Sequence, residues 1–384
     1  MLAGCACVLG VASAVYGYGC GIYDTSLLLP GTQDAGADGV AVDAAAGDAR
    51  DGARDSGPGP CPLVEPPAKP AMDDPSDAGD QTFVVALHTI ELFGDGGAAE
   101  PIGYDLDKVF TCCDGGPESC KAIVTGATHC DDLGGRDNSG GQLLSTLASL
   151  DPSQFNTSSI SNRLQTGQYS ILMQILHYNG QPNDTQVTAG LYASLGVPGD
   201  AGALWNGQDS WSLDQSFVVT PDASPILPTH FDGNAYVSGG TLVIHVNFPI
   251  TIGATSGSTF SINLTAGVLT GVLTPESNGT YALKAGQIAG RWNISDLLVA
   301  LQSINYLGMP ICQGTSTYTF IKSQICQYAD IMTDPTLDLT GASCNAISLG
   351  VAFTADPALL GAVNAPIVKN GQCGDAAPTP DNCP

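Results

Sequence analysis

Apolar and polar residues alternate along much of the chain, above all between positions 82 and 310. TLVIHVNFPI at 241–250 puts a large apolar residue at every second position, namely Leu242, Ile244, Val246 and Phe248. Side chains of a strand point alternately to its two faces, so this pattern predicts a half-buried strand. The same alternation occurs in STFSINLTAGV, SILMQILHY, FVVALHTIELF and AISLGVAFT, with turn sequences such as NGQPNDT and ESNGTY nearby. We therefore predict a mainly β fold, an antiparallel two-sheet sandwich of jelly-roll or lectin-like type.

Three segments carry apolar residues at helical spacing: SGGQLLSTLASLDP (139–152), SDLLVALQSINYLG (295–308) and TFIKSQICQYADIM (319–332). Ser295 is the expected N-cap of the second segment. The third contains Cys326, which we expect to form a disulfide with Cys312 or Cys344 and so to attach this helix to the sheet. A few short helices thus accompany the strands.

The chain begins with an uncharged, apolar run at residues 2–19 that is rich in Ala and Gly. Its length fits a signal peptide at 1–19 and is short for a membrane span. Gly19 precedes Cys20, an arrangement similar to the lipobox of bacterial lipoproteins, in which the cysteine is acylated and becomes the first mature residue. We predict lipidation of Cys20. Ordinary secretion with Cys20 in a disulfide, and secretion by a eukaryotic cell, are the alternatives.

Residues 20–80 consist largely of Ala, Gly, Asp and Pro. Such a segment buries too little apolar surface to offset the ordering of its backbone, so we predict a disordered linker. A β-rich domain is expected at 81–373, followed by a short tail at 374–384.

The formal net charge is -26, with only 11 Lys and Arg residues. This charge repels phosphate backbones and anionic lipid, so nucleic-acid binding and electrostatic adhesion to membranes are excluded. The acyl group on Cys20 remains as the means of membrane attachment. Gly21 occupies the position where inner-membrane retention signals use Asp. We therefore expect an exported protein anchored to the outer membrane or displayed on the cell surface.

The chain contains 13 cysteines. Removal of the leader and lipidation of Cys20 would leave an even set, as expected for five disulfides in an oxidising compartment. The pairing cannot be deduced from the sequence. A zinc site built from the cysteines at 112–130 is an alternative, although the spacing lacks a CxxC pair.

Aspartates are concentrated in GYDLDKVFTCC and in HCDDLGGRDNSGG. The glycines of the second segment allow its backbone to fold around an ion, and several carboxylates are the ligands that Ca2+ prefers. The sequence therefore predicts a calcium site, with a structural role, formed by Asp105, Asp107, Asp131, Asp132, Asp137 and Asn138. Turn formation together with an N-cap for the following helix is the alternative.

A second polar cluster lies in WNGQDSWSLD, where Trp205 and Trp211 flank Asp209 and Asp214 follows closely. Exposed indole faces beside carboxylates suit sugar rings, so these four residues are a candidate polysaccharide-binding site. The alternative is that both rings cover the edge or the core of a sheet.

No nucleophile elbow, P-loop, dinucleotide fingerprint or HExxH motif occurs in the sequence. We therefore favour a non-enzymatic surface lipoprotein that binds polysaccharide or another envelope component. The alternative is a secreted glycan hydrolase that uses two of Asp105, Asp107, Asp209, Asp214 and Asp232. Such an enzyme needs two carboxylates about 5–10 Å apart in an open cleft.

From Cys20 onward the chain resembles a group of predicted envelope lipoproteins abundant in myxobacteria. The resemblance rests on CGIYDTSLL, GYDLDKVFTC, CDDLGGRDNSGG, AGRWNISDLL and CNAISLGVAFTADPALLGA, which are spread over most of the expected domain. The group has no assigned activity, so the resemblance implies an envelope location and a shared architecture. Its recurring cysteines and aspartates fall at 105–138, which implies a shared disulfide and metal feature there.

Overall fold

The computed structural model describes residues 61–71, 79–92, 101–150, 157–199, 202–253, 259–277, 279–303, 305–306, 309–365, 373 and 379–384. The chain divides into two compact units, Met1–Ser56 and Gly57–Pro384, and all described residues belong to the second. The predicted signal peptide, Cys20 and most of the predicted linker lie outside the described residues.

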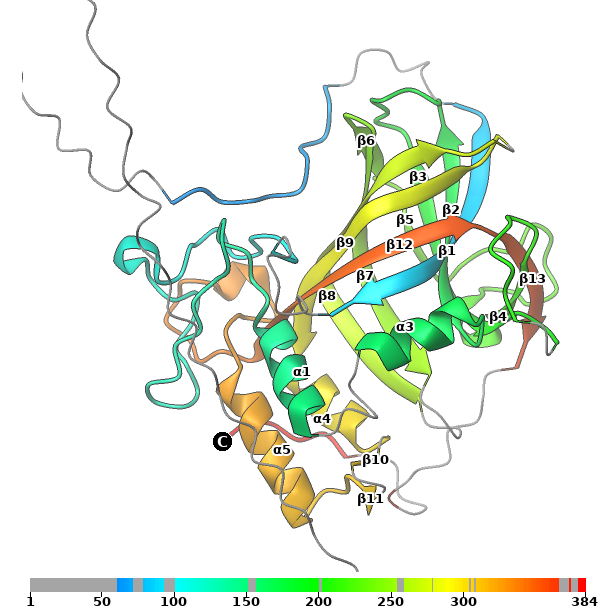
Figure 1. Cartoon of the computed structure of the whole chain (residues 1–384). Coiled ribbons are helices and arrows are strands. Elements are labelled where there is room, and N and C mark those ends of the chain that lie inside the picture. The colour runs from blue at the N-terminus through cyan, green and yellow to red at the C-terminus, as the bar shows by residue number, and fades with distance from the viewer. Residues whose placement is uncertain are drawn as a thin grey trace, which may run out of the picture. The chain divides into compact units, whose positions relative to one another are not determined.

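Eleven strands form a single sheet in the order β13-β4-β3-β2-β1-β12-β9-β8-β7-β6, with β5 paired to β3 (Figure 1). Neighbouring strands are antiparallel except β13 and β4, which are parallel. The strands are β1 (Gln81–Glu91), β2 (Ser170–Tyr178), β3 (Thr188–Gly196), β4 (Ser210–Asp214), β5 (His230–Asp232), β6 (Tyr236–Ser238), β7 (Thr241–Gly253), β8 (Thr259–Pro275), β9 (Tyr281–Asn293), β12 (Ala346–Pro357) and β13 (Leu359–Asn364). A separate two-stranded sheet pairs β10 (Asn305–Tyr306) with β11 (Met309–Pro310).

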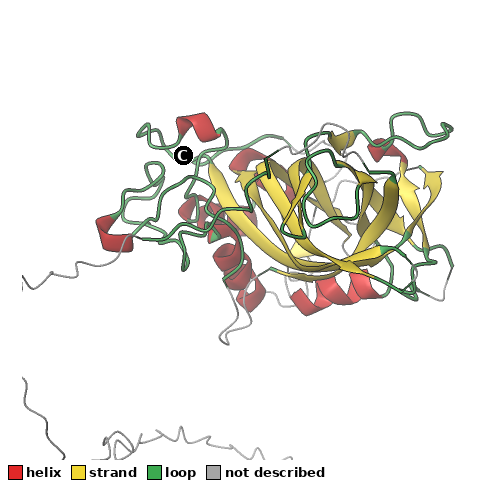
Figure 2. Cartoon of the chain, turned by 90° about the horizontal axis from the view of Figure 1, so that it is seen from above, coloured by secondary structure: helices red, strands yellow, loops and turns green. Residues whose placement is uncertain are grey.

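The mainly β prediction is confirmed, but the strands form one continuous curled sheet instead of the two packed sheets of a sandwich (Figure 2). Asp184, just before β3, exchanges two backbone hydrogen bonds with Val237 of β6 (2.9 and 2.8 Å), so distant parts of the sheet meet. On β7, the amide of His245 donates to the carboxylate of Asp232 on β5 (2.7 Å). Register shifts interrupt the ladders of the long strands β7, β8 and β9. Such bulges bend a strand and increase its twist, which lets the sheet curl.

The predicted apolar face of β7 lies in the core. Leu242, Ile244, Val246 and Phe248 are all at most 5% exposed, whereas His245 between them has a side chain that is 58% exposed. The period-two pattern therefore identified the inner face of this strand correctly.

In the part of the chain that the structure describes, four α-helices accompany the sheet: α1 (Ser139–Leu150), α3 (Thr157–Gln165), α4 (Ile294–Leu301) and α5 (Ser316–Gln327). Figure 1 shows α1, α4 and α5 grouped at one end of the sheet, while α3 lies beside β1. The three predicted helices exist with shorter bounds, and the N-cap of α4 is Asn293 instead of Ser295. The Asn293 side chain accepts hydrogen bonds from the amides of Ser295 and Asp296. No helix in the described residues combines the length and the apolar character needed to cross a bilayer.

Five disulfides confirm the predicted number: Cys61–Cys113, Cys112–Cys130, Cys120–Cys344, Cys312–Cys373 and Cys326–Cys383. The expected partner of Cys326 was wrong, because the C-terminal residues pack on α5. There, Asp381 accepts hydrogen bonds from the Tyr318 hydroxyl and the Lys322 ammonium group, each at 2.8 Å, and thereby holds Cys383 beside the helix. The described residues 379–384 are thus attached to the domain by ion pairing and a disulfide.

Candidate metal centre

Two aspartate-rich segments, GYDLDKVFTCC and HCDDLGGRDNSGG, lie side by side in the structure. The amide of Asp137 in the second donates to the carbonyl of Tyr104 in the first (3.1 Å). Further along, the Cys112–Cys130 disulfide joins the two segments covalently. This pairing brings together carboxylates that are separated by about thirty positions in the sequence.

Asp105, Asp107 and Asp137 form the centre of the cluster. Each contributes one carboxylate oxygen to a group whose members all lie within 4.8 Å of one another. The three residues are 6%, 7% and 3% exposed, respectively. The spacing and the oxygen-only donor set are those of a site for a hard cation such as Ca2+.

Backbone amides orient all three carboxylates. Asp105 Oδ1 accepts from the amide of Lys108 (2.7 Å), Asp107 Oδ1 from Val109 (2.9 Å) and Asp137 Oδ2 from Leu106 (2.6 Å). The carboxylates of Asp105 and Asp107 accept from amides two or three residues further along the chain. The carboxylate of Asp137 accepts from an amide of the neighbouring segment. These hydrogen bonds fix the carboxylates in place before any ion binds.

One oxygen of the cluster has no compensating interaction. Asp105 Oδ2 is fully buried and has no hydrogen-bond donor within the described part of the chain. The neighbouring carboxylate of Asp107 is itself only an acceptor while ionised. A buried, unpaired carboxylate oxygen is costly, and this cost is offset either by protonation, which the raised pKa of Asp105 favours, or by a bound cation.

Asp131 and Asp330 extend the cluster on one side. Asp131 Oδ2 accepts from the amide of Thr111 (2.6 Å), and Asp330 accepts from both the amide and the hydroxyl of Ser348. Both carboxylates line a small cavity of about 20 Å³, which also contacts His129. This volume is enough for about one water molecule or ion. The cluster therefore borders a space that one water molecule or one bare ion can occupy.

The electrostatics of the site follow from burial and crowding. Desolvation raises the pKa of Asp105 to about 6 and the pKa values of Asp131 and Asp330 to about 7. The pKa values of Asp107 and Asp137 are also raised, first by burial and, for Asp137, next by repulsion from Asp107. Five carboxylates in this space disfavour full ionisation unless positive charge is added.

The nearest buried cation already has its own counter-ion. Arg291 is 1% exposed, and its guanidinium group binds both oxygens of Asp338 at 2.9 and 2.6 Å. It also donates to the carbonyls of Leu106 and Met332, each at 2.7 Å. Arg291 thus positions the backbone between Asp105 and Asp107, while Asp338 offsets most of its charge.

Two predicted ligands have other roles. Asn138 Oδ1 accepts from the amides of Gly141 (3.0 Å) and Gly350 (2.8 Å), so it caps the start of α1 and ties it to β12. The backbone of Asp132 exchanges hydrogen bonds with the backbone of Arg136. Burial raises the pKa of Asp132, and the charge of Arg136 opposes this rise. The turn-and-cap interpretation therefore applies to Asn138, and calcium binding by the others stays a prediction.

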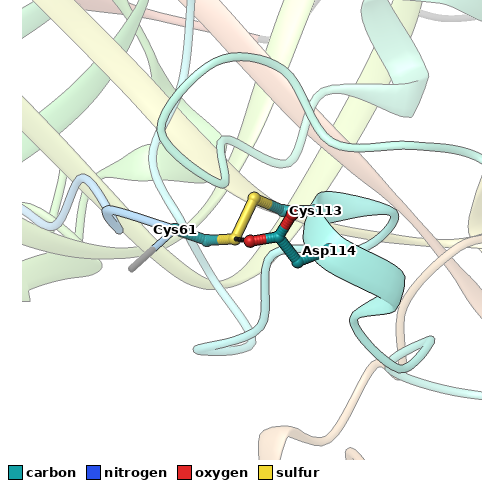
Figure 3. Close-up of side chains that lie close together, drawn as sticks. All are labelled: Cys61, Cys113 and Asp114. Carbon is teal, nitrogen blue, oxygen red and sulfur yellow. Dashed lines mark hydrogen bonds between the residues drawn. A yellow bond between two sulfur atoms is a disulfide. The ribbon is translucent and has the colours of Figure 1, made fainter. Parts of the chain in front are cut away.

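The cysteines do not contribute to a metal site here. Cys112, Cys113, Cys120 and Cys130 are all in disulfides, so the zinc alternative is wrong for these residues. Figure 3 shows Asp114 beside the Cys61–Cys113 disulfide, with its Oδ2 atom 3.7 Å from Cys61 Sγ. A disulfide offers no thiolate ligand, so this contact is structural.

The predicted polysaccharide-binding residues are mostly used for local structure. Trp211 is 0% exposed, so its ring face is not open to a ligand, and the expected pair of exposed indoles is not found. Trp205 is partly exposed and stacks on His88 with ring centroids 3.9 Å apart. Asp209 accepts from the amide of Trp205 (2.6 Å), and Asp214 caps a short 3-10 helix, Gln215–Phe217.

The carboxylates proposed for a hydrolase do not form an open pair. Asp105 and Asp107 lie close together, but both are buried in the cluster described above. Asp232 accepts from the amides of Asn234 and His245 and pairs with the His245 ring at 3.0 Å. The alternative enzymatic function gains no support from these residues.

In the presence of a chelator, we expect the protein to melt at a higher temperature at about pH 5.5 than at about pH 7.5. The pKa values of Asp131 and Asp330 are about 7 in the folded protein, against a usual value of 3.8. A carboxyl whose pKa is raised by folding stabilises the protein below its unfolded pKa, and this contribution is lost as the pH rises through the folded pKa. Asp330→Asn should therefore reduce the difference in melting temperature between about pH 5.5 and about pH 7.5. The measurement is thermal unfolding followed by circular dichroism, and equal pH profiles for both proteins would contradict the expectation.

Comparison with known proteins finds no matching family model, no similar curated protein and no similar solved structure.

Proposed function

We propose that this chain is an exported, calcium-stabilised binding domain of the cell envelope, attached to the membrane through Cys20. Five disulfides are typical of an oxidising, extracytoplasmic compartment and support the export part of the proposal. The lipid anchor is supported only by the sequence around Cys20, which lies outside the described residues.

The unpaired oxygen of Asp105 carries the calcium part of the proposal. It is buried among carboxylates whose other oxygens are held by backbone amides, so its electrostatic environment is incomplete without a cation. The three central ligands, Asp105, Asp107 and Asp137, offer only oxygen atoms, and the nearby cysteines are held in disulfides. Ca2+ accepts irregular sets of oxygen ligands, whereas Mg2+ requires near-octahedral geometry and Zn2+ is bound mainly by nitrogen and sulfur.

The position of the site indicates a structural role. Its ligands come from the segments before α1, and Asp330 follows α5 and binds Ser348 on β12. A bound ion would therefore hold the disulfide-rich segment against the sheet and the helices. Extracellular modules typically bind such ions with dissociation constants of about 0.1–1 mM.

Calcium is expected to raise the melting temperature of the wild-type protein relative to chelator. At a hundredfold excess over the dissociation constant, ion binding adds about 2.7 kcal/mol to the free energy of unfolding. For a domain of about 300 residues this corresponds to a rise of roughly 4–5 °C. Asp137→Asn should remove most of the difference, because it takes one charge from the centre of the cluster.

Asp132→Asn is the matched control, since Asp132 lies outside the central group and should leave the calcium response intact. Isothermal titration of the folded protein with Ca2+ gives the stoichiometry independently of melting. Identical melting curves in calcium and chelator for wild type would overturn the calcium proposal. If Asp137→Asn and Asp132→Asn abolished the calcium-dependent rise in melting temperature equally, the ion would not be bound by the central group of three aspartates.

A further inference from the structure

A groove separate from the metal centre lies between α3 and the strands β1, β12 and β9. Its volume is about 480 Å³, within the range of about 300–1,000 Å³ that is usual for small-molecule sites. Residues of α3 form one wall of the groove, and residues of the three strands form the other.

The helical wall consists of a polar stripe. Ser158, Ser161, Asn162 and Gln165 line the groove at i, i+3, i+4 and i+7 positions, which share one face of a helix. Ile160 and Leu164 on α3 are 5% and 2% exposed and belong to the main core. The core thus sets the orientation of α3, and the residues of the polar stripe border the groove, where Ser158, Asn162 and Gln165 remain exposed to solvent.

Ser161 attaches the helix to the sheet. Its hydroxyl donates to the carbonyl of Ile90 (2.6 Å) and accepts from the Ile90 amide (3.4 Å). Ile90 pairs with Phe353 on β12, whereas the ladder between β1 and β2 contains no residue beyond Ala86. The helix therefore occupies the edge of β1 where β2 has ended, and the groove is a fixed feature of this junction.

The strand wall combines hydroxyl groups with small residues. The hydroxyls of Thr89 and Thr354 hydrogen-bond to each other at 2.7 Å, and the Glu91 side chain lies on the same wall. Ala285 and Gly286 on β9 also line the groove, and the absence of a side chain at Gly286 makes room for the ring of Phe353. Ala285 has a left-handed backbone (φ 47°), at a register shift between β9 and β12. Strained backbone and bulges of this kind often occur next to binding sites, where they re-aim side chains.

One polar atom of the groove lacks a partner. Thr157 Oγ1, at the first residue of α3, is buried and has no hydrogen-bond partner among the described residues. This atom is not accessible from the groove, so the accessible polar groups of the helical wall are those of the exposed residues Ser158, Asn162 and Gln165.

We propose that this groove binds a short segment of an uncharged polysaccharide. Its described lining is rich in hydroxyl and amide groups, which complement sugar hydroxyls, and Glu91 is the one ionisable residue in it. A carboxylate together with a net charge of -26 disfavours anionic ligands. The two large apolar lining residues, Ile90 and Phe353, are 7% and 3% exposed, too little for a lipid site. The inference rests on the proposed function in one respect, because an exported domain is exposed to polysaccharide.

The test is isothermal titration of the calcium-loaded protein with hexasaccharides of glucose, xylose and N-acetylglucosamine, and with oligogalacturonate as the anionic probe. We expect at least one neutral hexasaccharide to bind and oligogalacturonate not to bind. Asn162→Ala, which removes an amide from the helical wall, should weaken binding at least tenfold. Ala352→Leu, which fills the groove, should do the same, while Gln208→Ala at an exposed position outside the groove should leave binding unchanged.

Three results would overturn the proposal: no binding of any neutral probe, preferential binding of the anionic probe, or equal affinity in wild type, Asn162→Ala and Ala352→Leu. Melting curves of the same variants in calcium distinguish a failure of the groove proposal from a failure of the calcium proposal. A calcium-dependent melting temperature without saccharide binding refutes only the groove. Saccharide binding by a protein that does not respond to calcium refutes only the metal centre.

Discussion

Replacing Arg291 by leucine is expected to destabilise the domain by about 3–5 kcal/mol. Arg291 is 1% exposed and its side chain donates to both oxygens of Asp338 and to two backbone carbonyls. Its removal leaves the buried Asp338 carboxylate without a cation, with only the Ser119 hydroxyl as a donor, and frees the carbonyl of Leu106 beside the metal centre. The measurement is urea denaturation of the calcium-loaded protein, with the change read from the midpoint at constant slope.

The double variant Arg291→Leu with Asp338→Asn is the control for the uncompensated charge. It should recover a large part of the lost stability, because removing both charges of a buried pair costs less than removing one. Lys108→Leu gives a second comparison, since Lys108 forms an exposed pair with Glu65 at 3.4 Å and should change little. Equal destabilisation by the single and the double variant would show that packing, and not charge, is the main contribution of Arg291.

Replacing both Cys120 and Cys344 by alanine is expected to cost about 5 kcal/mol, because this disulfide closes the longest loop of the chain. The two cysteines are 224 positions apart, against 18 for Cys112 and Cys130. If a disulfide stabilises the protein by restricting the unfolded chain, the Cys112–Cys130 disulfide contributes only about 3 kcal/mol. Both double variants are compared by urea denaturation with calcium present. A larger loss for the Cys112–Cys130 pair than for the Cys120–Cys344 pair would contradict this ordering.

The local pattern of the sequence was enough to find five strands of the main sheet, β1, β2, β7, β8 and β12, and three of the four helices in the described residues. SILMQILHY coincides with β2, and the apolar positions of TLVIHVNFPI all face the core. Helix α3 was missed because TSSISNRLQ contains only two large apolar residues, Ile160 and Leu164. Ile160 and Leu164 lie four positions apart, as on one helix face, but two large apolar residues were too few to predict a helix.

The candidate site was found in part. Asp105, Asp107 and Asp137 come together as predicted, since the two segments that carry them are joined by backbone pairing and a disulfide. Asp330 was missed because it lies nearly two hundred positions from Asp137 and has no neighbouring aspartate cluster that would mark it as a ligand. Trp211 was assigned to a ligand surface, yet its position on β4 next to Leu213 and Tyr192 places the ring in a buried apolar cluster.

By itself, the sequence determined the secondary structure type, the acidic charge and the location of the aspartate-rich segments. These are properties of neighbouring residues, because alternation, helical spacing and composition are set within one or two turns of chain. Only the tertiary structure decided that the strands form one curled sheet, since inward and outward positions alternate in the same way in a sandwich. It also decided that Cys326 pairs with Cys383 and that Asp330 joins the cluster. Both depend on strand register and on contacts between distant segments, which no local pattern encodes.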